Sequence, residues 1–296
     1  MGNRLVSNLL TLLTFLVSFQ GSAADLEPAT IKKKIIEKST FKKWSNIVTA
    51  EYTPEISGFE SSNMFYVGDF NYRTSPRNRF RWFQRVIHQI IPESGKENSG
   101  ETIGLNPRLQ YFYYFKEPED KSYQFGLRFG TELGTSPDSR EDGVKAIPNV
   151  RFEFDKRFGF MTISLRPYVS YWITEYSTGR TGNPLPMFTL GHNLNVLVNF
   201  TKKFSWNLEL DTGFQMFQPA DVKDAQSFNS NPNAAPLETS KTALYVATDF
   251  GYQLNKSFLM RIGYYQFDKF VSDGKYDLEL LNNKTTRFFV GLDFSF

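Results

Sequence analysis

The 296-residue sequence contains no cysteine and only two histidines. The lack of cysteine excludes a disulfide-held scaffold. The net charge is only +3, which is too small to indicate a nucleic-acid partner. Beyond residue 24, no apolar run approaches the roughly 18 residues that a membrane-spanning helix needs. The sequence therefore offers neither a disulfide framework nor a helical membrane anchor.

Aromatic residues are abundant instead. They make up 17% of the chain, with 30 phenylalanines and 15 tyrosines, although the mean hydropathy is only −0.40. Strands favour aromatic side chains more than helices do. The composition therefore indicates a protein rich in β-structure.

The first residues have the pattern of a secretory signal. Arg4 precedes a short apolar stretch from Leu9 to Phe19, and the small residues Ser22, Ala23 and Ala24 follow it. We therefore predict a cleaved export signal over residues 1–24.

Residues 25–43 form a lysine-rich leader after this signal. The isoleucines of the leader have helical spacing, which would fit a short basic amphipathic helix that touches anionic head groups or a partner. We favour instead a solvated periplasmic leader before the first strand, because runs of like charge often stay unfolded.

From Trp44 onward, apolar and polar residues alternate with a period of two. In "FTLGHNLNVLVNF", Phe188, Leu190, Leu194 and other apolar residues alternate with Asn193, Asn195 and other small or polar ones. Strict alternation predicts a sheet with one apolar and one polar face. The segments are long enough for tilted strands that cross a bilayer, which need about 9 to 11 residues.

Twelve such strands are predicted, in a single domain over residues 44–296. Their ranges are 46–57, 62–73, 80–91, 103–115, 123–134, 146–155, 160–175, 188–200, 204–217, 242–254, 258–269 and 285–296. Mostly short connections alternate with longer loops, and the strand count is even, as in outer-membrane barrels. The range 80–91 also fits an amphipathic helix, so both interpretations stay open there.

The last strand ends the chain on an aromatic residue. Phe288, Val290, Leu292, Phe294 and Phe296 share one face. Gly291, Phe294 and Phe296 match the C-terminal assembly signal of Gram-negative outer-membrane β-barrel proteins, and at this level of architecture the chain resembles that class. The resemblance implies an all-β fold, a single antiparallel transmembrane β-barrel, in the outer membrane of a Gram-negative bacterium. It also implies transient contact with the barrel-assembly machinery.

If the apolar faces meet outer-membrane lipid, the charged residues of the other faces surround the interior. The inward cations are Arg73, Arg81, Arg85, Arg108, Arg128, Arg151, Arg166, Arg261 and Arg287. The inward acids are Asp69, Glu132, Glu153, Asp155, Glu209, Asp211, Asp249 and Asp293.

Two interpretations of this lumen stay open. In one, these residues line a narrow, porin-like channel for passive diffusion of small hydrophilic solutes, with Arg108, Arg128 and Arg166 facing the acids of residues 204–254 across the pore. In the other, they form a salt-bridge network in a plugged structural or surface-contact barrel. A barrel of twelve strands lies between the filled and the open kinds, so strand number does not decide, but we favour the narrow channel.

An outer-membrane enzyme that hydrolyses lipid or peptide is the third possibility. Membrane-embedded phospholipases place a serine two residues after a histidine, but His88 and His192 are followed at that spacing by Ile90 and Leu194. His192 is expected to face lipid. The acidic stretch "SPDSRED" lacks the spacing of a calcium loop. We therefore predict no catalytic residue, no metal site and no cofactor.

Overall fold

The structure is a computed structural model that describes residues 43–54, 62–91, 101–115, 122–179, 184–219, 240–268, 271–272, 275–276 and 286–296. The predicted export signal and all of the predicted leader except Lys43 lie outside these ranges. Among the described residues, no helix has the length and apolar character needed to cross a membrane.

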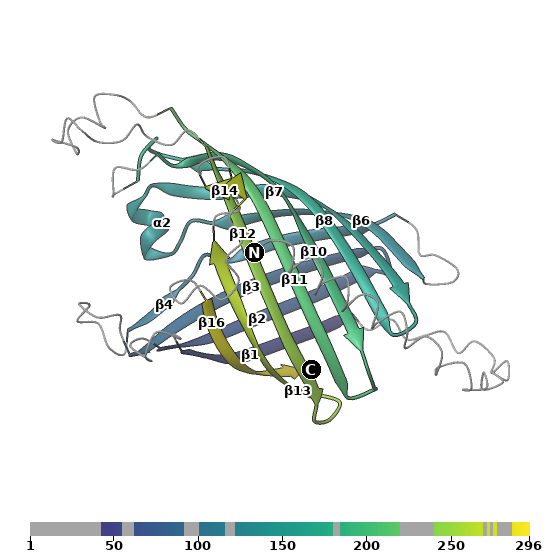
Figure 1. Ribbon diagram of the computed structural model, residues 1–296. Helices are drawn as coiled ribbons and strands as arrows, with labels where there is room; N and C mark the ends of the chain where they lie inside the picture. Colours follow the sequence, from purple (N-terminus) through teal and green to yellow (C-terminus); the bar gives the residue numbers. More distant parts are fainter. Residues whose placement is uncertain are drawn as a thin grey trace. The chain divides into compact units, whose positions relative to one another are not determined.

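The described chain consists almost entirely of antiparallel strands (Figure 1). The first half contains β1 (Trp44–Pro54), β2 (Ser62–Ser75), β3 (Asn78–Ile91), β4 (Thr102–Gly104), β5 (Arg108–Tyr114), β6 (Tyr123–Leu133) and β7 (Val144–Phe158). The second half contains β8 (Met161–Tyr171), β9 (Ile173–Thr174), β10 (Pro186–Asn199), β11 (Phe204–Phe217), β12 (Ser240–Gln253), β13 (Phe258–Asp268), β14 (Val271–Ser272), β15 (Lys275–Tyr276) and β16 (Thr286–Ser295). One short helix, α2 (Pro137–Glu141), lies between β6 and β7.

The sheet closes on itself. The last strand, β16, pairs with both β13 and β1, while β1 continues to β2 and β2 to β3. When β4 and β5 are counted as one strand, and β8 and β9 as another, the closed sheet has twelve strands. The predicted fold class is therefore confirmed. Closure leaves no open edge, which a bilayer interior requires because lipid supplies no hydrogen-bond partners.

Residues 80–91 lie within strand β3. The helical alternative for this segment is therefore wrong. The segment pairs with β2 over its whole length and with β5 from Asn78 to Phe83.

The predicted strand 103–115 is interrupted in the structure. It divides into β4 and β5, with Leu105, Asn106 and Pro107 between them. Proline has no backbone N–H to donate to a neighbouring strand, which accounts for a break at this point. The predicted strand 160–175 likewise divides at Trp172, after which β9 pairs with β7.

The two faces of the sheet differ sharply. Large apolar side chains on alternate positions are exposed on the outer face, including Trp82, Leu190, Ile262 and Val290, each with half or more of its surface accessible. Polar residues of the opposite face are buried, among them Arg128, Glu153 and Asn193. This is the inverse of a water-soluble protein and matches a barrel with lipid outside.

Four described connections at one end of the barrel are tight turns, at residues 76–77, 159–160, 200–203 and 254–257. The turn after β7 uses Gly159 with a φ of +58°, a conformation that suits glycine. The chain terminus Phe296 lies at this same end, where its backbone exchanges hydrogen bonds with Asn46 of β1. The helix α2 lies at the other end (Figure 1).

Candidate functional site

The charged inner face of the barrel is the candidate site. The ten charged residues predicted to be the main lining of the lumen come from β5, β6, β7, β8, β11, β12 and β13, which together form more than half of the wall. They are Arg108, Arg128, Arg151, Arg166, Arg261, Glu132, Glu153, Glu209, Asp211 and Asp249. Nine of them, all but Arg151, form ion pairs or hydrogen bonds with inner-face neighbours, and these contacts fall into three clusters.

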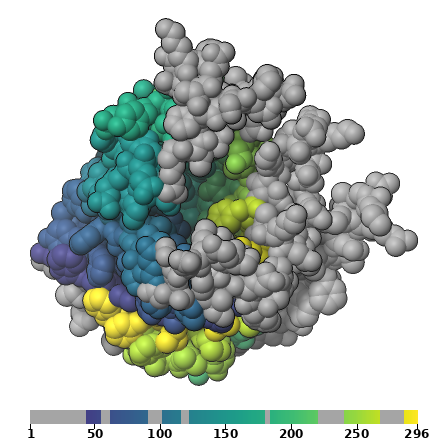
Figure 2. Space-filling view, turned by 90° about the vertical axis from the view of Figure 1, so that its left-hand side faces the viewer, coloured from purple at the N-terminus to yellow at the C-terminus, as the bar shows by residue number. Residues whose placement is uncertain are grey.

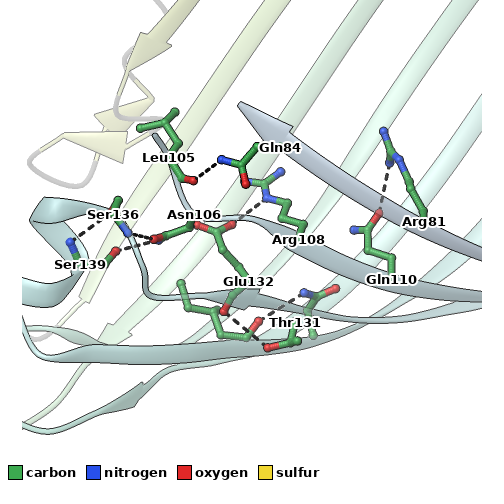
Figure 3. A network of polar contacts seen from close by, with 12 residues as sticks. Arg81, Gln84, Leu105, Asn106, Arg108, Gln110, Thr131, Glu132, Ser136 and Ser139 are labelled. Carbon is green, nitrogen blue, oxygen red and sulfur yellow. Dashed lines mark hydrogen bonds and ion pairs between the residues drawn. The ribbon is translucent and has the colours of Figure 1, made fainter. Parts of the chain in front are cut away.

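The first cluster joins strands β5 to β8 by ion pairs. Arg108 Nε lies 2.7 Å from Glu132 (Figure 3), and Arg128 Nε lies 2.7 Å from Glu153. Glu153 also approaches Arg166, at 3.1 Å. The side chains of Arg128 and Glu153 are each only 8% exposed, so this pair is the most deeply buried of the cluster.

Asp155 completes the first cluster, at 3.5 Å from Arg166. The three arginines predicted to face an acidic wall are therefore each balanced by a carboxylate of a neighbouring strand. The sequence shows alternation along a strand, but not which charges become neighbours across strands, because that depends on register.

The second cluster holds the acids of β11 and β12 through neutral donors. Asn193 donates to Glu209 at 2.6 Å, and Tyr168 donates its hydroxyl to Asp211 at 2.9 Å. The amide of Asn207 donates to Asp249 at 3.1 Å. Among the described residues, none of these three carboxylates forms an ion pair with an arginine.

The third cluster lies where the barrel closes. Arg261 of β13 bonds Asp293 of β16 at 2.9 Å and lies 3.5 Å from Glu51 of β1. Asp293 also accepts a hydrogen bond from Thr49. One guanidinium thus connects the three strands that form the seam.

Arg81 of β3 and Asp69 of β2 form a further ion pair outside the three clusters, with a distance of 2.7 Å between nitrogen and oxygen.

Among the described residues, sequence reasoning missed two half-buried charges of the inner face, Glu51 and Arg79. Glu51 shares its face with Thr49 and Thr53, and that polar alternation was the signal for it. Arg79 falls one residue before the predicted start of its strand.

Aromatic rings hold several arginines on this face. The guanidinium carbon of Arg79 lies 3.8 Å from the ring centre of Phe112. That of Arg151 lies 4.6 Å from the ring centre of Tyr168. Arg151 has no ion pair among the described residues, so its ring contact is what positions it.

Two polar cavities lie inside the barrel. One has a volume of about 450 Å³ and is lined by Asp69, Arg81 and Arg128, among others. The second, of about 280 Å³, is lined by Arg85 and Asp249, among others. Figure 2 shows a hollow in the end of the barrel that carries α2. The described side chains therefore do not fill the interior.

A polar network fixes the rim beside α2 (Figure 3). The side chain of Asn106 accepts a hydrogen bond from the backbone of Ser136 at 2.8 Å and donates to Ser139 at 2.7 Å. It also donates to Glu132, the partner of Arg108. The break between β4 and β5 thus ties the helix to the charged lining.

The residues of the predicted assembly signal lie on both faces of β16. Phe294 and Phe296 are exposed, with 38% and 51% of their surfaces accessible, and their rings stack 5.5 Å apart. Gly291 lies between Arg261 and Glu51 as the cross-strand partner of both. Recognition by an assembly machinery stays a prediction.

Neither histidine has catalytic surroundings in the described part of the chain. His88 contacts Thr102, and His192 contacts its cross-strand partner Thr212 on the exposed face. Over the described residues, no group of three or more His, Asp or Glu side chains is arranged to hold a metal ion.

A closed antiparallel barrel with an apolar outer face and a polar inner face is the fold of the Gram-negative outer-membrane β-barrel proteins. No protein-family model matches this chain, and no curated protein matches it in sequence.

Two solved structures resemble it in fold. One is an outer-membrane channel from Pseudomonas putida F1, with a TM-score of 0.53 and 10% identity over 86% of this chain and 95% of that one. The other is the NanC porin, with a TM-score of 0.51 and 10% identity over 84% of this chain and 98% of that one. At such low identity the likeness concerns the fold.

Proposed function

We propose that this protein is an outer-membrane channel for the passive diffusion of small hydrophilic solutes. The observation that carries the proposal is a charged inner face that still leaves polar cavities of about 450 and 280 Å³ inside a lipid-facing barrel. Charged linings of this kind set the selectivity of pores. The fold shared with a porin and an outer-membrane channel supports it.

The plugged barrel is the second candidate, and the ion pairs favour it to some degree. Each arginine of the first cluster has a carboxylate partner, which holds the wall in shape. A plug, however, calls for side chains packed to the density of a protein interior. Side chains of the inner face such as Arg108, which is 41% exposed, do not reach that density.

Hydrolytic activity receives less support than transport. Catalysis needs a nucleophile and a base within hydrogen-bond reach. The histidines of the described strands lie on the outer face, beside threonines and lipid-facing residues.

For a channel, the partners of the protein are outer-membrane lipid, the assembly machinery during biogenesis, and the solutes that pass through it.

Conductance of the purified full-length protein in a planar bilayer tests the proposal. We expect stable ion-conducting steps. Ser170 of β8 lies on the inner face, opposite Asn149 and Thr189, and retains some exposure. Ser170→Trp should reduce the step size, because the added indole occupies the lumen.

Val169→Trp is the matched control. Val169 precedes Ser170 on the same strand, faces outward and is 46% exposed. Its indole should lie in lipid and leave the step size unchanged. Persistent silence of the wild-type protein, or equal steps for the wild type and Ser170→Trp, would support the plugged barrel instead.

A further inference from the structure

A single row of arginines crosses the inner face of the barrel. Six residues on β2, β3, β5, β6, β7 and β8 are successive cross-strand partners, each opposite the next. In order, they are Arg73, Arg79, Phe112, Arg128, Arg151 and Tyr168. We call this set the arginine row. Its next two partners are Gly191 and Gly213, and the side chain of Tyr168 extends over both of them.

The row places like charges directly opposite each other twice. Arg73 faces Arg79, and Arg128 faces Arg151. Like charges at directly opposed positions of a sheet destabilise it. The row itself contains no carboxylate. Glu153 contacts Arg128 but is shared with Arg166, and Asp211 accepts a hydrogen bond from Tyr168 of the row. The four arginines of the row therefore outnumber these two carboxylates.

Aromatic rings orient the arginines of the row. Arg79 stacks on Phe112 at 3.8 Å, and Arg151 stacks on Tyr168 at 4.6 Å. The buried Nε atoms of Arg79 and Arg151 have no hydrogen-bond partner among the described residues. A stacked guanidinium keeps its donor edge free to bind a carboxylate through two parallel hydrogen bonds.

The charge of the neighbouring cavity agrees with this geometry. The cavity of about 450 Å³ includes Arg79 and Arg128 of the row. The charged side chains of its lining are Arg79, Arg81, Arg128, Arg166, Asp69 and Glu153, an excess of two positive side chains. The second cavity has three carboxylates against two arginines, so its lining is negative by one. An anion inside the barrel is therefore attracted to the side that holds the row.

We propose that the arginine row is a binding path for small organic anions, with di- and tricarboxylates as the preferred class. The proposal rests on the channel function proposed above. Neighbouring strands lie about 4.8 Å apart. A dicarboxylate can thus reach two adjacent arginines of the row, whereas a monocarboxylate reaches one.

The test compares succinate with its uncharged isostere succinamide in planar bilayers that contain the full-length protein. Succinate should reduce the ion current in a concentration-dependent way, and succinamide should not. In a salt gradient, the reversal potential should indicate a preference for anions. Acetate should require a higher concentration than succinate for the same reduction.

Three variants locate the effect. Arg79→Gln and Arg151→Gln should each raise the half-blocking concentration of succinate about tenfold, the effect of one lost charge-assisted hydrogen bond. Arg85→Gln is the matched control, because it removes the same charge from the same strand β3 but lines the second cavity. It should leave the block within about twofold of the wild type.

Calorimetric titration of the detergent-solubilised protein with succinate separates this proposal from the channel function. If the protein never conducts but binds succinate, and Arg79→Gln weakens that binding, the anion-binding proposal is upheld and the channel function is overturned. If the protein conducts but succinate and succinamide affect the current equally, the anion-binding proposal alone is overturned. Equal losses of succinate affinity in Arg79→Gln and Arg85→Gln would also overturn the anion-binding proposal alone.

Discussion

At the scale of single residues, the inner face depends on a few shared carboxylates. Glu153 contacts both Arg128 and Arg166, and its side chain is only 8% exposed. Removing one partner of a buried ion pair is costly, because the remaining charge stays desolvated. Glu153 is therefore the lining residue whose loss should affect stability most.

We predict that Glu153→Gln destabilises the folded barrel by about 3 kcal/mol, since Arg128 would keep a buried charge without a full counter-charge. The midpoint of urea unfolding in lipid vesicles, followed by tryptophan fluorescence, measures the effect. Asp155→Asn is the control, because Asp155 is 25% exposed and, among the described residues, its one ion pair is with Arg166 at a longer 3.5 Å. Equal midpoints for the wild type and Glu153→Gln would contradict the prediction.

The sequence predicts which charged residues lie on the inner face in most cases, but not which of them contact each other. Alternation assigns Arg128 and Glu153 to one face, because side chains in a strand alternate. The contact between them depends on the register of β6 against β7, where Arg128 lies opposite Arg151 rather than Glu153. Arg79 was missed because a strand boundary predicted from propensity alone is uncertain by a few residues.

At the scale of elements, the strands were predictable and their irregularities less so. Long alternating segments gave ranges that mostly agree with the structure within a few residues at each end. The helix α2 was missed, although Ser136 caps it and Pro137 occupies its first turn, which is a recognisable helix start. At only five residues, it lacks the periodic pattern that reveals longer helices.

The rim network around Asn106 leads to a prediction for this helix. Asn106→Ala removes its hydrogen bonds to Ser136, Ser139 and Glu132. Because these are side-chain links between the helix and the wall, the rim segment should open more often. Tryptic cleavage after the exposed Arg140, followed by mass spectrometry, should become several-fold faster.

Ser139→Ala is the graded control for this experiment. This substitution removes the Ser139 hydroxyl, and with it the hydrogen bond that Asn106 donates to it. The hydrogen bond between the Ser136 backbone and Asn106 stays in place. Its cleavage rate should lie between those of the wild type and Asn106→Ala. An unchanged rate in Asn106→Ala would show that the rim is held in another way.

At the scale of the whole molecule, the proposed function depends on which face of the sheet points outward and which points into the barrel. The apolar positions must meet lipid and the arginine-bearing positions must meet water, in a barrel closed by β1 and β16. Closure was predictable, because the strand count was even and an open edge is excluded in a bilayer. The placement of charge around the barrel was not, because it follows from the registers of all the strands together.

Labelling along β11 tests this arrangement most directly, and the cysteine-free chain suits it. Single cysteines at positions 207 to 212 would carry a spin label in protein reconstituted into lipid vesicles. We predict that labels at Leu208, Leu210 and Thr212 collide more with lipid-soluble oxygen. Labels at Asn207, Glu209 and Asp211 should collide more with a water-soluble nickel chelate. The reverse pattern, or accessibility that does not alternate, would contradict a barrel with lipid outside and water within.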